Sequence, residues 1–497
     1  MPKAVVVGAG LGGLAASLAL CEKPDWEVTV VEAASRTGGK VGWERHEGVI
    51  FDTGPSLLTL PGVVEKVCRQ VECPMEDRLT LVRPQPAFRY YFSDGTTFEV
   101  AHSVEKTAQH ISEALGARAG QEYAAFLDYA KGIWEVAAPA FVWGSAPTLG
   151  SALRLGLTKL REFRRVDPMR TMAEAIEERI SDWRLRDFFW RYATYNGSDP
   201  RSAPATLNCI CWVEQGLGFW GVEGGMNQLV DALEKLARQR GVTFLLEHPV
   251  TAIRRREGVF EIAGEDYELD GDAVVVNADV RHLVEELAGH GVDPNLSLNG
   301  PSSMSAWTAV IRARRRPPGE RCAHAVIFPD GDYGREFSDI FDRKTPPADP
   351  AIYLCAREKA HQARGWKREE PLFVMVNMPP GMESEADEHR CERLKHHVLQ
   401  RLRQLHHIDG DDEVIWERTP RDLAHRFPGS RGSLYGAASN GRLAAFRRPA
   451  NRVDAVPGLV LAGGSAHPGG GVPLSLQSGL QAARELLSHG EKWGLFE

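Results

Sequence analysis

The most continuous hydrophobic pattern in the chain runs from Ala4 to Cys21, where no side chain carries a charge. A lysine before it would suit a secretory signal, and its length just reaches that of a membrane span. Cys21 would suit a lipid anchor, but Leu20 occupies a position where such sites have a small residue. Inside the stretch, three β-branched residues lead into a glycine-rich turn and then into helix-forming residues. This order predicts a strand, a tight turn and a helix of a folded domain.

The same pattern of buried strands and amphipathic helices recurs later in the chain. Residues 26–33 predict a second strand, and the apolar run within Asp272–Val280 predicts another buried strand. Between these strands, two glycines precede a helix whose apolar face carries Leu229, Leu233 and Leu236. The alternation indicates an α/β fold with a parallel sheet.

The C-terminal region repeats the pattern once more. Leu459–Ala462 predicts a strand, and a glycine-rich loop connects it to a helix that begins near Pro473. One face of that helix carries four apolar residues at helical spacing, Leu476, Leu480, Ala483 and Leu487.

Composition and charge narrow the functional classes. With 497 residues, the chain is long enough for two or three domains. The 59 basic and 67 acidic residues give a net charge of −8, which argues against a general affinity for nucleic acid. Eight scattered cysteines are typical of free thiols in a reducing cytoplasm. Cys209 and Cys211 form C-x-C without a second pair, so we interpret them as alternate residues of one strand and expect no metal site.

The first glycine-rich turn has the spacing of a dinucleotide-binding motif. Gly8, Gly10 and Gly13 match G-x-G-x-x-G directly after a strand, and the following helix offers free N–H groups to a pyrophosphate. Glu32 follows Gly13 at roughly the 20 residues expected for an acid that binds a ribose hydroxyl. Three neighbouring residues are expected to contact the same nucleotide, namely Ala9, Leu14 and Ala33.

Two further motifs indicate which dinucleotide is bound. The segment after Glu32 carries Arg36, Gly39 and Lys40, and it resembles the R-x-G-G extension of flavoproteins related to amine oxidases and carotenoid desaturases. The segment FDTGPS is similar to the one that passes near the flavin in those proteins. The alternative is that both are ordinary surface turns. The resemblance implies FAD as cofactor, with the second segment contributing Asp52, Thr53, Gly54, Pro55 and Ser56.

The C-terminal loop resembles the closing motif of bacterial phytoene desaturases. Their HPG-x-G-x-P is matched from His467 to Pro473, and a helix N-terminus at this point can stabilise negative charge on a reduced flavin. Leu474 stands where those enzymes commonly have glycine, and Gly464 stands where amine oxidases have an acid. The resemblance places Gly463, Gly464, Ser465, Val472, Pro473 and Leu474 beside the cofactor.

The resemblance also implies how the chain is divided. Residues 1–56, 223–290 and 450–497 are expected to form one discontinuous, Rossmann-like FAD-binding domain of the amine-oxidase type. Within it, a strand residue, Val250, should meet the adenine through its backbone, and Asn277 and Ala278 should contact the cofactor. Residues 57–222 and 291–449 should form an inserted α+β substrate domain. No second G-x-G-x-x-G follows a strand, so we expect quinone or oxygen as the electron acceptor.

The stretch from Arg191 to Trp220 is most similar to hydroxycarotenoid 3,4-desaturases. It implies a long apolar polyene as substrate, although a proline-rich turn before a core strand would give the same sequence. Aromatic density favours a tunnel for such a ligand, and ordinary core packing is the alternative. The aromatic residues are Phe188, Phe189, Trp190, Tyr192, Tyr195, Trp212, Phe219 and Trp220.

The segment Ser151–Arg165 combines leucines on one helical face with several basic residues. Such a helix can lie in a lipid interface, and it can equally be a solvated surface helix. A carotenoid enzyme must load its substrate from lipid, so we expect helices around residues 130–190 to contact a membrane surface. The expected location is cytoplasmic, peripherally bound to the inner face of the cell membrane. We expect Arg312–Pro318 to form a solvated loop.

Desaturation removes a hydride and a proton from adjacent carbons. Two residues are candidates for the proton transfer: His467, which the motif places near the flavin, and Glu214, at the end of the aromatic strand. His467 could instead shape its loop, and Glu214 could face solvent or an arginine. Rival functions on the same fold are a phytoene desaturase, an amine oxidase, a polyene isomerase or saturase, and a non-catalytic isoprenoid-lipid-binding protein.

Overall fold

The computed structural model describes residues 1–22, 26–147, 165–317 and 319–493. Its first sheet is parallel, with the strand order β10-β2-β1-β14-β20. Strands from all three predicted nucleotide segments meet in this sheet, which confirms the predicted strands near residues 26–33, 272–280 and 459–462. Their bounds are β1 (Lys3–Val7), β2 (Glu27–Val31), β10 (Thr243–Leu245), β14 (Ala273–Val276) and β20 (Leu459–Leu461).

Both faces of this sheet are covered, which explains why its strands are apolar throughout. One face packs on three helices, α1 (Leu11–Cys21), α10 (Asn227–Gln239) and α16 (Val472–His489). The other face packs on an antiparallel sheet, β11 (Ala252–Arg256), β12 (Val259–Ala263) and β13 (Glu268–Gly271). In β1, Val6 therefore faces the helices, while Val5 and Val7 face the small sheet.

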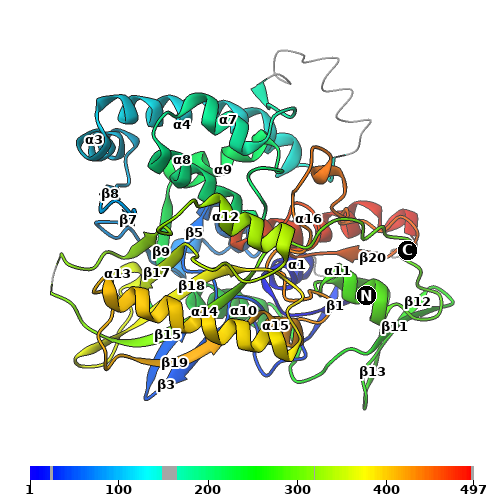
Figure 1. Ribbon diagram of the computed structural model, residues 1–497. Helices are drawn as coiled ribbons and strands as arrows, with labels where there is room; N and C mark the ends of the chain where they lie inside the picture. Colours follow the sequence, from blue (N-terminus) through cyan, green and yellow to red (C-terminus); the bar gives the residue numbers. More distant parts are fainter. Residues whose placement is uncertain (23–25, 148–164, 318, 494–497) are drawn as a thin grey trace.

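The uncharged opening stretch of the sequence is β1, a turn and the buried helix α1, as predicted. Helix α16 crosses α1 so closely that a side chain at Gly479 would overlap the backbone at Gly12. In Figure 1, these two helices lie side by side next to β20. The close crossing brings the C-terminal loop over the glycine-rich turn at the other end of the chain.

A second, mixed sheet has seven strands in the order β19-β15-β18-β17-β16-β7-β8. Helix α14 (Glu385–Gln404) covers one face of it, with Leu394, Val398 and Leu402 in the shared core (Figure 1). The strands are β7 (Phe88–Tyr91), β8 (Thr97–Val100), β15 (Ser305–Arg314), β16 (His324–Ile327), β17 (Ile352–Ala356), β18 (Glu369–Met378) and β19 (Glu413–Arg418).

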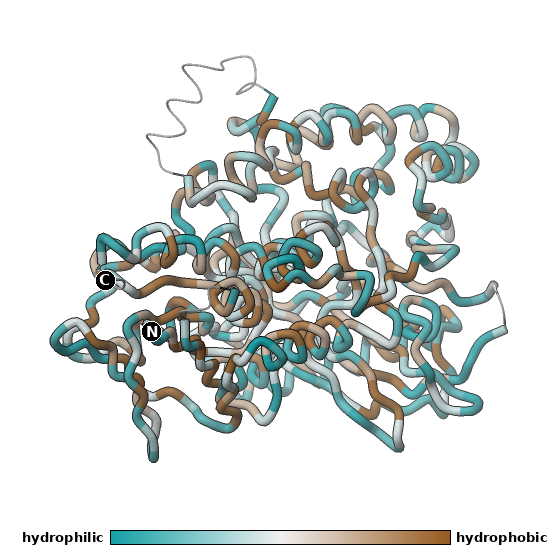
Figure 2. The backbone as a smooth tube through the Cα atoms, turned by 180° about the vertical axis from the view of Figure 1, so that it is seen from behind, coloured by the Kyte–Doolittle hydropathy of each residue, from teal (hydrophilic) through white to brown (hydrophobic). Residues whose placement is uncertain are grey.

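A layer of helices lies above this sheet in Figure 1. It consists of α3 (Val104–Leu115), α4 (Ala117–Phe141), α7 (Met172–Arg179), α8 (Trp183–Trp190) and α9 (Cys209–Gln215), with two 3₁₀ helices, Arg191–Asn196 and Ala205–Asn208. Figure 2 shows that hydrophobic residues are concentrated in the centre of the molecule, whereas the loops at its edge carry mostly hydrophilic residues.

The remaining elements connect these parts. They are the hairpin β3 (Trp43–His46) and β4 (Val49–Asp52), the short strands β5 (Leu58–Thr59), β6 (Leu81–Val82) and β9 (Phe219–Val222), and the helices α2 (Pro61–Arg69), α11 (Val280–His282), α12 (Gly334–Phe337), α13 (Arg357–His361) and α15 (Pro420–Arg426).

The predicted strand around Cys209 and Cys211 is wrong, because the segment is helical from Ala205 to Gln215. Pro204 precedes the first turn, where its fixed φ is compatible with a helix start. The helix packs on α4 and buries Cys211 in the core that the two helices share. This tertiary packing overrides the strand preference of the β-branched and aromatic residues in the segment. Both cysteines are free thiols.

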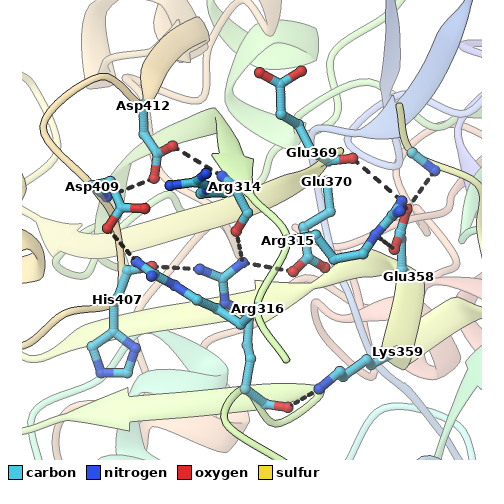
Figure 3. A network of polar contacts seen from close by, with 12 residues as sticks. Arg314, Arg315, Arg316, Glu358, Lys359, Glu369, Glu370, His407, Asp409 and Asp412 are labelled. Atoms are coloured by element: carbon cyan, nitrogen blue, oxygen red, sulfur yellow. Dashed lines mark hydrogen bonds and ion pairs between the residues drawn. The ribbon is translucent and has the colours of Figure 1, made fainter. Parts of the chain in front are cut away.

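The expected solvated loop at Arg312–Pro318 is also wrong in part. Residues 312–314 are the end of β15, and the arginines that follow are paired with carboxylates (Figure 3). Arg315 donates to Glu358 at 2.8 Å and Arg316 to Asp409 at 2.8 Å. The positive charge of this run is therefore balanced locally by acidic residues from α13, from β18 and from neighbouring loops.

The amphipathic basic segment Ser151–Arg165 lies outside the described residues, except for its last residue. Across the part of the chain that the structure describes, no helix combines the length and the hydrophobicity needed to cross a bilayer.

One buried histidine makes stability depend on pH. His361 is fully buried in α13, and its Nδ1 accepts a hydrogen bond from the Val222 N–H at 3.1 Å. Burial lowers the pKa of His361 to about 4. Above pH 6.5 the ring is neutral in both the folded and unfolded chains. Below that pH the unfolded chain binds the proton first, so stability falls as the pH falls toward 4.

We expect His361→Asn to flatten this dependence, because the asparagine oxygen can accept from Val222 but does not titrate. Between pH 6.5 and 5.0, the wild type should lose about 2 kcal/mol more than the variant, at about 1.36 kcal/mol per pH unit. Thermal unfolding of the FAD-loaded protein across this range measures the difference. His396→Asn, at an exposed histidine of α14, is the control. An unchanged slope in His361→Asn would show that other groups cause the pH dependence.

Candidate functional site

The turn between β1 and α1 depends on its glycines. Gly8 has a φ of +98°, and a side chain at Gly13 would overlap the Gly8 carbonyl oxygen. A Cβ at Gly10 would lie 2.8 Å from the Asn277 side-chain nitrogen. That nitrogen donates to the Gly8 oxygen at 3.1 Å. Asn277, predicted to contact the cofactor, therefore holds the turn in place at the end of β14, and Ala278 follows it.

Glu32 lies at the carboxyl end of β2, as predicted. Its carboxylate accepts hydrogen bonds from the N–H groups of Ala9, at 2.7 Å, and of Ala34, at 2.9 Å, which follows Ala33. These bonds fix the acid beside the start of α1. The first backbone bond of that helix runs from the Leu14 N–H to the Gly10 oxygen at 2.9 Å.

The second glycine turn lies against the first, because the Gly38 N–H donates to the Ala9 oxygen at 2.8 Å. Gly39 follows with a φ of +57°. Arg36 pairs with Glu44 at 3.1 Å. Lys40 is half-buried and donates to two backbone oxygens, of residues 433 and 434, at 3.0 and 2.9 Å. Burial lowers the pKa of this lysine, and Asp279 opposes the shift.

The FDTGPS segment connects the nucleotide sheet to the cavity described below. Asp52 accepts from the N–H groups of Met226 and Asn227, at 2.9 and 3.0 Å, and pairs with the buried Arg357 at 3.1 Å. It thereby fixes the start of α10. Thr53 donates its N–H to the Gly42 oxygen, and a side chain at Gly54 would overlap the Lys40 oxygen. The last two residues of the segment, Pro55 and Ser56, line the cavity.

The C-terminal loop follows the end of β20 and leads into α16. Gly463 and Gly464 come first, and the Ser465 hydroxyl accepts from the Val280 N–H at 3.0 Å. Gly471 then precedes the helix with a φ of +104°. A side chain there would meet nothing within 4 Å, so open space adjoins the first turn of the helix. Val472, Pro473 and Leu474 form that first turn, and the stretch from 467 to 474 lines the cavity.

These features fit FAD. At Gly10 and at Gly471, no side chain among the described residues caps the helix, and neither first turn contains an acid. Free N–H groups at both helix starts are therefore available for anionic groups. One helix start adjoins the ribose acid Glu32, and the other opens on the cavity. The dinucleotide can thus be held at one helix and its redox-active ring at the other.

One predicted cofactor residue is not where the sequence indicated. Val250 lies in the loop between β10 and β11, not in a strand. Pro249 before it has no N–H to donate to a sheet, which ends strand pairing at this point. The backbone groups of Val250 take part in no strand pairing, so they can still meet a ligand.

A cavity of about 1060 Å³ extends from the C-terminal loop into the helical layer. This exceeds the 300–1,000 Å³ typical of sites for drug-sized ligands. Most of its wall is apolar, with contributions from α4, α9 and the loop after residue 441. Two apolar residues of the wall, Met169 and Leu443, are exposed at the surface. Toward the sheet the wall contains the polar residues Arg191, Tyr195, Tyr333, Tyr353 and Asn377.

The predicted aromatic tunnel is mostly wrong. Of the eight aromatic residues proposed for it, all of them described, only Tyr195 lines the cavity. Others, among them Phe188, Phe189 and Tyr192, are fully buried in the core beside β7 and α4. Ordinary core packing, the alternative to a tunnel, explains these buried aromatic residues. The cavity takes its aromatic rings instead from Trp134, Phe141, Tyr333, Tyr353, Tyr435 and Phe446.

Glu214 lies in α9 rather than at the end of a strand; it is shielded from solvent, and no arginine of the described residues pairs with it. It is 1% exposed, and its carboxylate accepts from the hydroxyls of Tyr192, at 2.8 Å, and Tyr195. Gln215 also donates to it at 3.0 Å. Glu214 does not line the cavity as described, whereas Tyr195 does. The carboxylate therefore positions Tyr195.

We expect Glu214→Gln to lower stability more than turnover. An amide replaces part of the acceptor with N–H groups, so one tyrosine hydroxyl loses its partner at a cost of about 1–3 kcal/mol. Turnover should stay within about threefold of wild type, whereas loss of a general base costs about 10²–10⁴-fold. Unfolding and kcat measured on protein with matched FAD content separate the two. A kcat lowered by 100-fold in stable, FAD-loaded protein would show that Glu214 takes part in the proton transfer.

His467 ties the C-terminal loop to the helical layer. Its Nε2 lies 3.0 Å from the Gly144 oxygen, and burial lowers its pKa, so the ring is a neutral donor at this contact. The backbone oxygen of His467 accepts from Asn451 and Ser478, at 2.8 and 2.6 Å. His467 lines the cavity, but its hydrogen bonds fix the conformation of its own loop.

Several cavity residues carried no signal in the sequence. Arg448 is one of them: its guanidinium donates to the oxygens of Tyr435, Ala437 and Gly464, and burial lowers its pKa to about 10. Arg191, Tyr333, Tyr353 and Asn377 come from different elements of the layer and the sheet. Only the tertiary fold brings them to one wall. Arg191 opens the stretch that resembles hydroxycarotenoid desaturases, but no local motif marks the other three.

The nucleotide turns, the parallel sheet and the C-terminal helix start define an FAD-dependent oxidoreductase. Residues 11–487 match the family model for flavin-containing amine oxidoreductases, and the chain belongs to that family.

Curated relatives are similar over the whole chain. A hydroxyneurosporene desaturase from Rubrivivax gelatinosus is 32% identical, over 98% of this chain and 93% of the relative. A 1-hydroxycarotenoid 3,4-desaturase from a Flavobacterium species is 30% identical, over 96% and 97%. Among solved structures, cyclohexylamine oxidase from Brevibacterium oxydans has a TM-score of 0.61 at 15% identity, covering 99% of both chains. That last likeness concerns the fold alone.

Proposed function

We propose that the protein desaturates an acyclic, hydroxylated carotenoid with FAD as the hydride acceptor. The observation that carries the proposal is a large apolar cavity whose wall includes residues 467–474 of the C-terminal loop. A long hydrocarbon fits such a cavity, whereas an amine substrate would need more polar groups along it. The similarity to desaturases of hydroxylated carotenoids supports the same substrate class. In this proposal, residues 1–56, 223–290 and 450–497 bind FAD, and residues 57–222 and 291–449 bind the substrate.

The reaction removes two hydrogens from adjacent saturated carbons and forms a conjugated double bond. Bound FAD supplies the acceptor for the hydride and its electron pair. The apolar wall excludes water from the developing cation, which the neighbouring double bonds delocalise, so a weak base is sufficient to take the proton.

Such a base lies behind the cavity wall. The Ser56 hydroxyl is 2.6 Å from the Tyr353 hydroxyl, which is 2.8 Å from Nδ1 of His324. Ser56 and Tyr353 line the cavity, and His324 is fully buried. Burial lowers the pKa of His324 well below its ordinary value, so the ring is neutral and has an acceptor nitrogen. The released proton can pass along this chain of hydroxyls to the ring.

The exposed side of the cavity is where a lipid-dissolved substrate would enter. Met169 is 62% exposed and Leu443 is 55% exposed, and both belong to the cavity wall. We place this side against the inner face of the cell membrane, with the helices around residues 130–190 in contact with it. Electrons then pass from the reduced cofactor to quinone or oxygen.

Expression in cells that accumulate different acyclic carotenoids tests the proposal. Lengthened conjugation in the pigment spectrum only where hydroxylated precursors are present would support it. Conversion of phytoene would assign the protein to the phytoene desaturases. An isomer or a more saturated product would assign it to the isomerases or saturases. An unchanged spectrum in every strain, with soluble FAD-loaded protein present, would contradict it.

A further inference from the structure

The polar end of the cavity contains a buried positive charge without an acid beside it. Arg191 is 8% exposed, and within the described chain no carboxylate lies within 4 Å of its guanidinium. Its one side-chain hydrogen bond to a described residue goes to the Tyr90 hydroxyl at 3.2 Å. The rest of the guanidinium lies among aromatic rings, 5.1 Å from the centroid of Tyr195 and 6.0 Å from that of Tyr353.

Burying a charge and its N–H donors without partners costs several kcal/mol, so a ligand that accepts hydrogen bonds is expected at such a position. Arg191 lines the cavity, and its N–H groups can therefore meet a bound molecule. Glu214 lies behind Tyr195, whose hydroxyl donates to its carboxylate. The guanidinium itself does not lose its proton in proteins, so the charge of Arg191 is permanent.

Two more polar groups of the same wall lack partners. Tyr333 is 1% exposed, and its hydroxyl forms no hydrogen bond with any described residue. Asn377 donates its amide to Glu336 at 2.9 Å, which leaves its carbonyl oxygen without a donor from the described chain. Glu336 is fixed in turn by the Ala351 N–H at 2.7 Å. The wall therefore offers donors at Arg191 and Tyr333 and a fixed acceptor at Asn377.

We propose that Arg191, Tyr333 and Asn377 bind a hydroxyl group at the end of the polyene and so determine which carotenoid is accepted. A hydroxyl accepts from the guanidinium and the tyrosine, and it donates to the asparagine oxygen. This assignment rests on the proposed function, because it specifies the substrate of the same cavity. A carotenoid without oxygen would leave these three groups unpaired, or would require water to remain at the end of an apolar channel.

Binding and turnover of hydroxyneurosporene and neurosporene test the assignment, since hydroxyneurosporene carries a terminal hydroxyl group that neurosporene lacks. Both are supplied in the same vesicles to FAD-loaded protein. For the wild type we expect the hydroxylated carotenoid to be preferred at least about tenfold in Kd and in kcat/KM. Tyr333→Phe and Arg191→Met should each reduce that preference to within about threefold, mainly by weakening the hydroxylated substrate.

Tyr123→Phe is the matched control. Its hydroxyl donates to Gln215 at 3.1 Å in the core and does not line the cavity as described, so the preference should stay at the wild-type value. Tyr333→Phe removes only an unpartnered hydroxyl, so it should fold even if Arg191→Met does not. Equal Kd values for the two carotenoids in the wild type would overturn the assignment, and so would a preference unchanged in Tyr333→Phe. A retained preference in Kd without desaturation would support this site while refuting the proposed reaction.

Discussion

Gly13→Ala should produce a colourless protein. A side chain at this position would overlap the Gly8 carbonyl oxygen, which the Asn277 amide already holds at 3.1 Å. Because both partners are backbone or fixed side chain, the turn must open and the start of α1 must move away from Glu32. We expect the affinity for FAD to fall at least about 100-fold, which corresponds to about 2.7 kcal/mol.

The FAD content of the purified variant and its Kd for added FAD measure this effect. Gly62→Ala is the control, because a side chain at Gly62 in α2 would meet nothing within 4 Å. That variant should bind FAD like the wild type and should be as stable or slightly more stable, by up to about 1 kcal/mol. A yellow Gly13→Ala protein with one FAD per chain would refute the role assigned to the turn.

Ile210→Trp should sharply reduce turnover without affecting cofactor binding. Ile210 lies in α9 and lines the cavity, so an indole at this position would occupy space that an extended polyene needs. A rigid conjugated chain cannot bend around the obstruction, and a displacement of about 1 Å at the reacting carbons can cost about 100-fold in rate. We therefore expect kcat/KM to fall by about 100-fold or more at wild-type FAD content.

Ile210→Ala provides the matched comparison, because it widens the cavity at the same position. That variant should keep turnover within about tenfold of wild type while losing some stability. Product formation measured by chromatography, normalised to bound FAD, distinguishes the two variants. If Ile210→Trp desaturates carotenoid at the wild-type rate, the substrate does not occupy this cavity.

The nucleotide half of the molecule could be predicted because its signals are local. Gly8 and Gly13 are required by the backbone of one turn, and Glu32 follows at a distance set by one helix and one strand. The strands of the parallel sheet are apolar throughout because both of their faces are buried. Such constraints appear in the sequence as fixed spacings, so the fold of this half follows from them.

The substrate half could not be predicted in the same way. The segment from Ala205 to Gln215 has the composition of a strand, yet packing on α4 makes it a helix. Glu214 consequently turned out to be buried among tyrosines behind the cavity. Arg191, Tyr333 and Asn377 converge from a 3₁₀ helix, a short loop and a strand that are far apart in sequence. Their relation depends on tertiary packing, which no local pattern records.

Val250 shows an intermediate case. The resemblance placed it in a strand, but Pro249 interrupts the hydrogen-bonding pattern that a strand needs. The proline was visible in the sequence and could have corrected this prediction.

A single anaerobic turnover tests most directly that this chain couples its FAD to desaturation of a hydroxylated carotenoid. FAD-loaded protein is mixed with hydroxyneurosporene in the absence of oxygen and quinone, and the pigments are examined by mass spectrometry. We predict one product molecule per bound FAD, lighter than the substrate by two hydrogens, with no further product until an acceptor is added. Unchanged substrate, or a product of unchanged mass, would contradict the account.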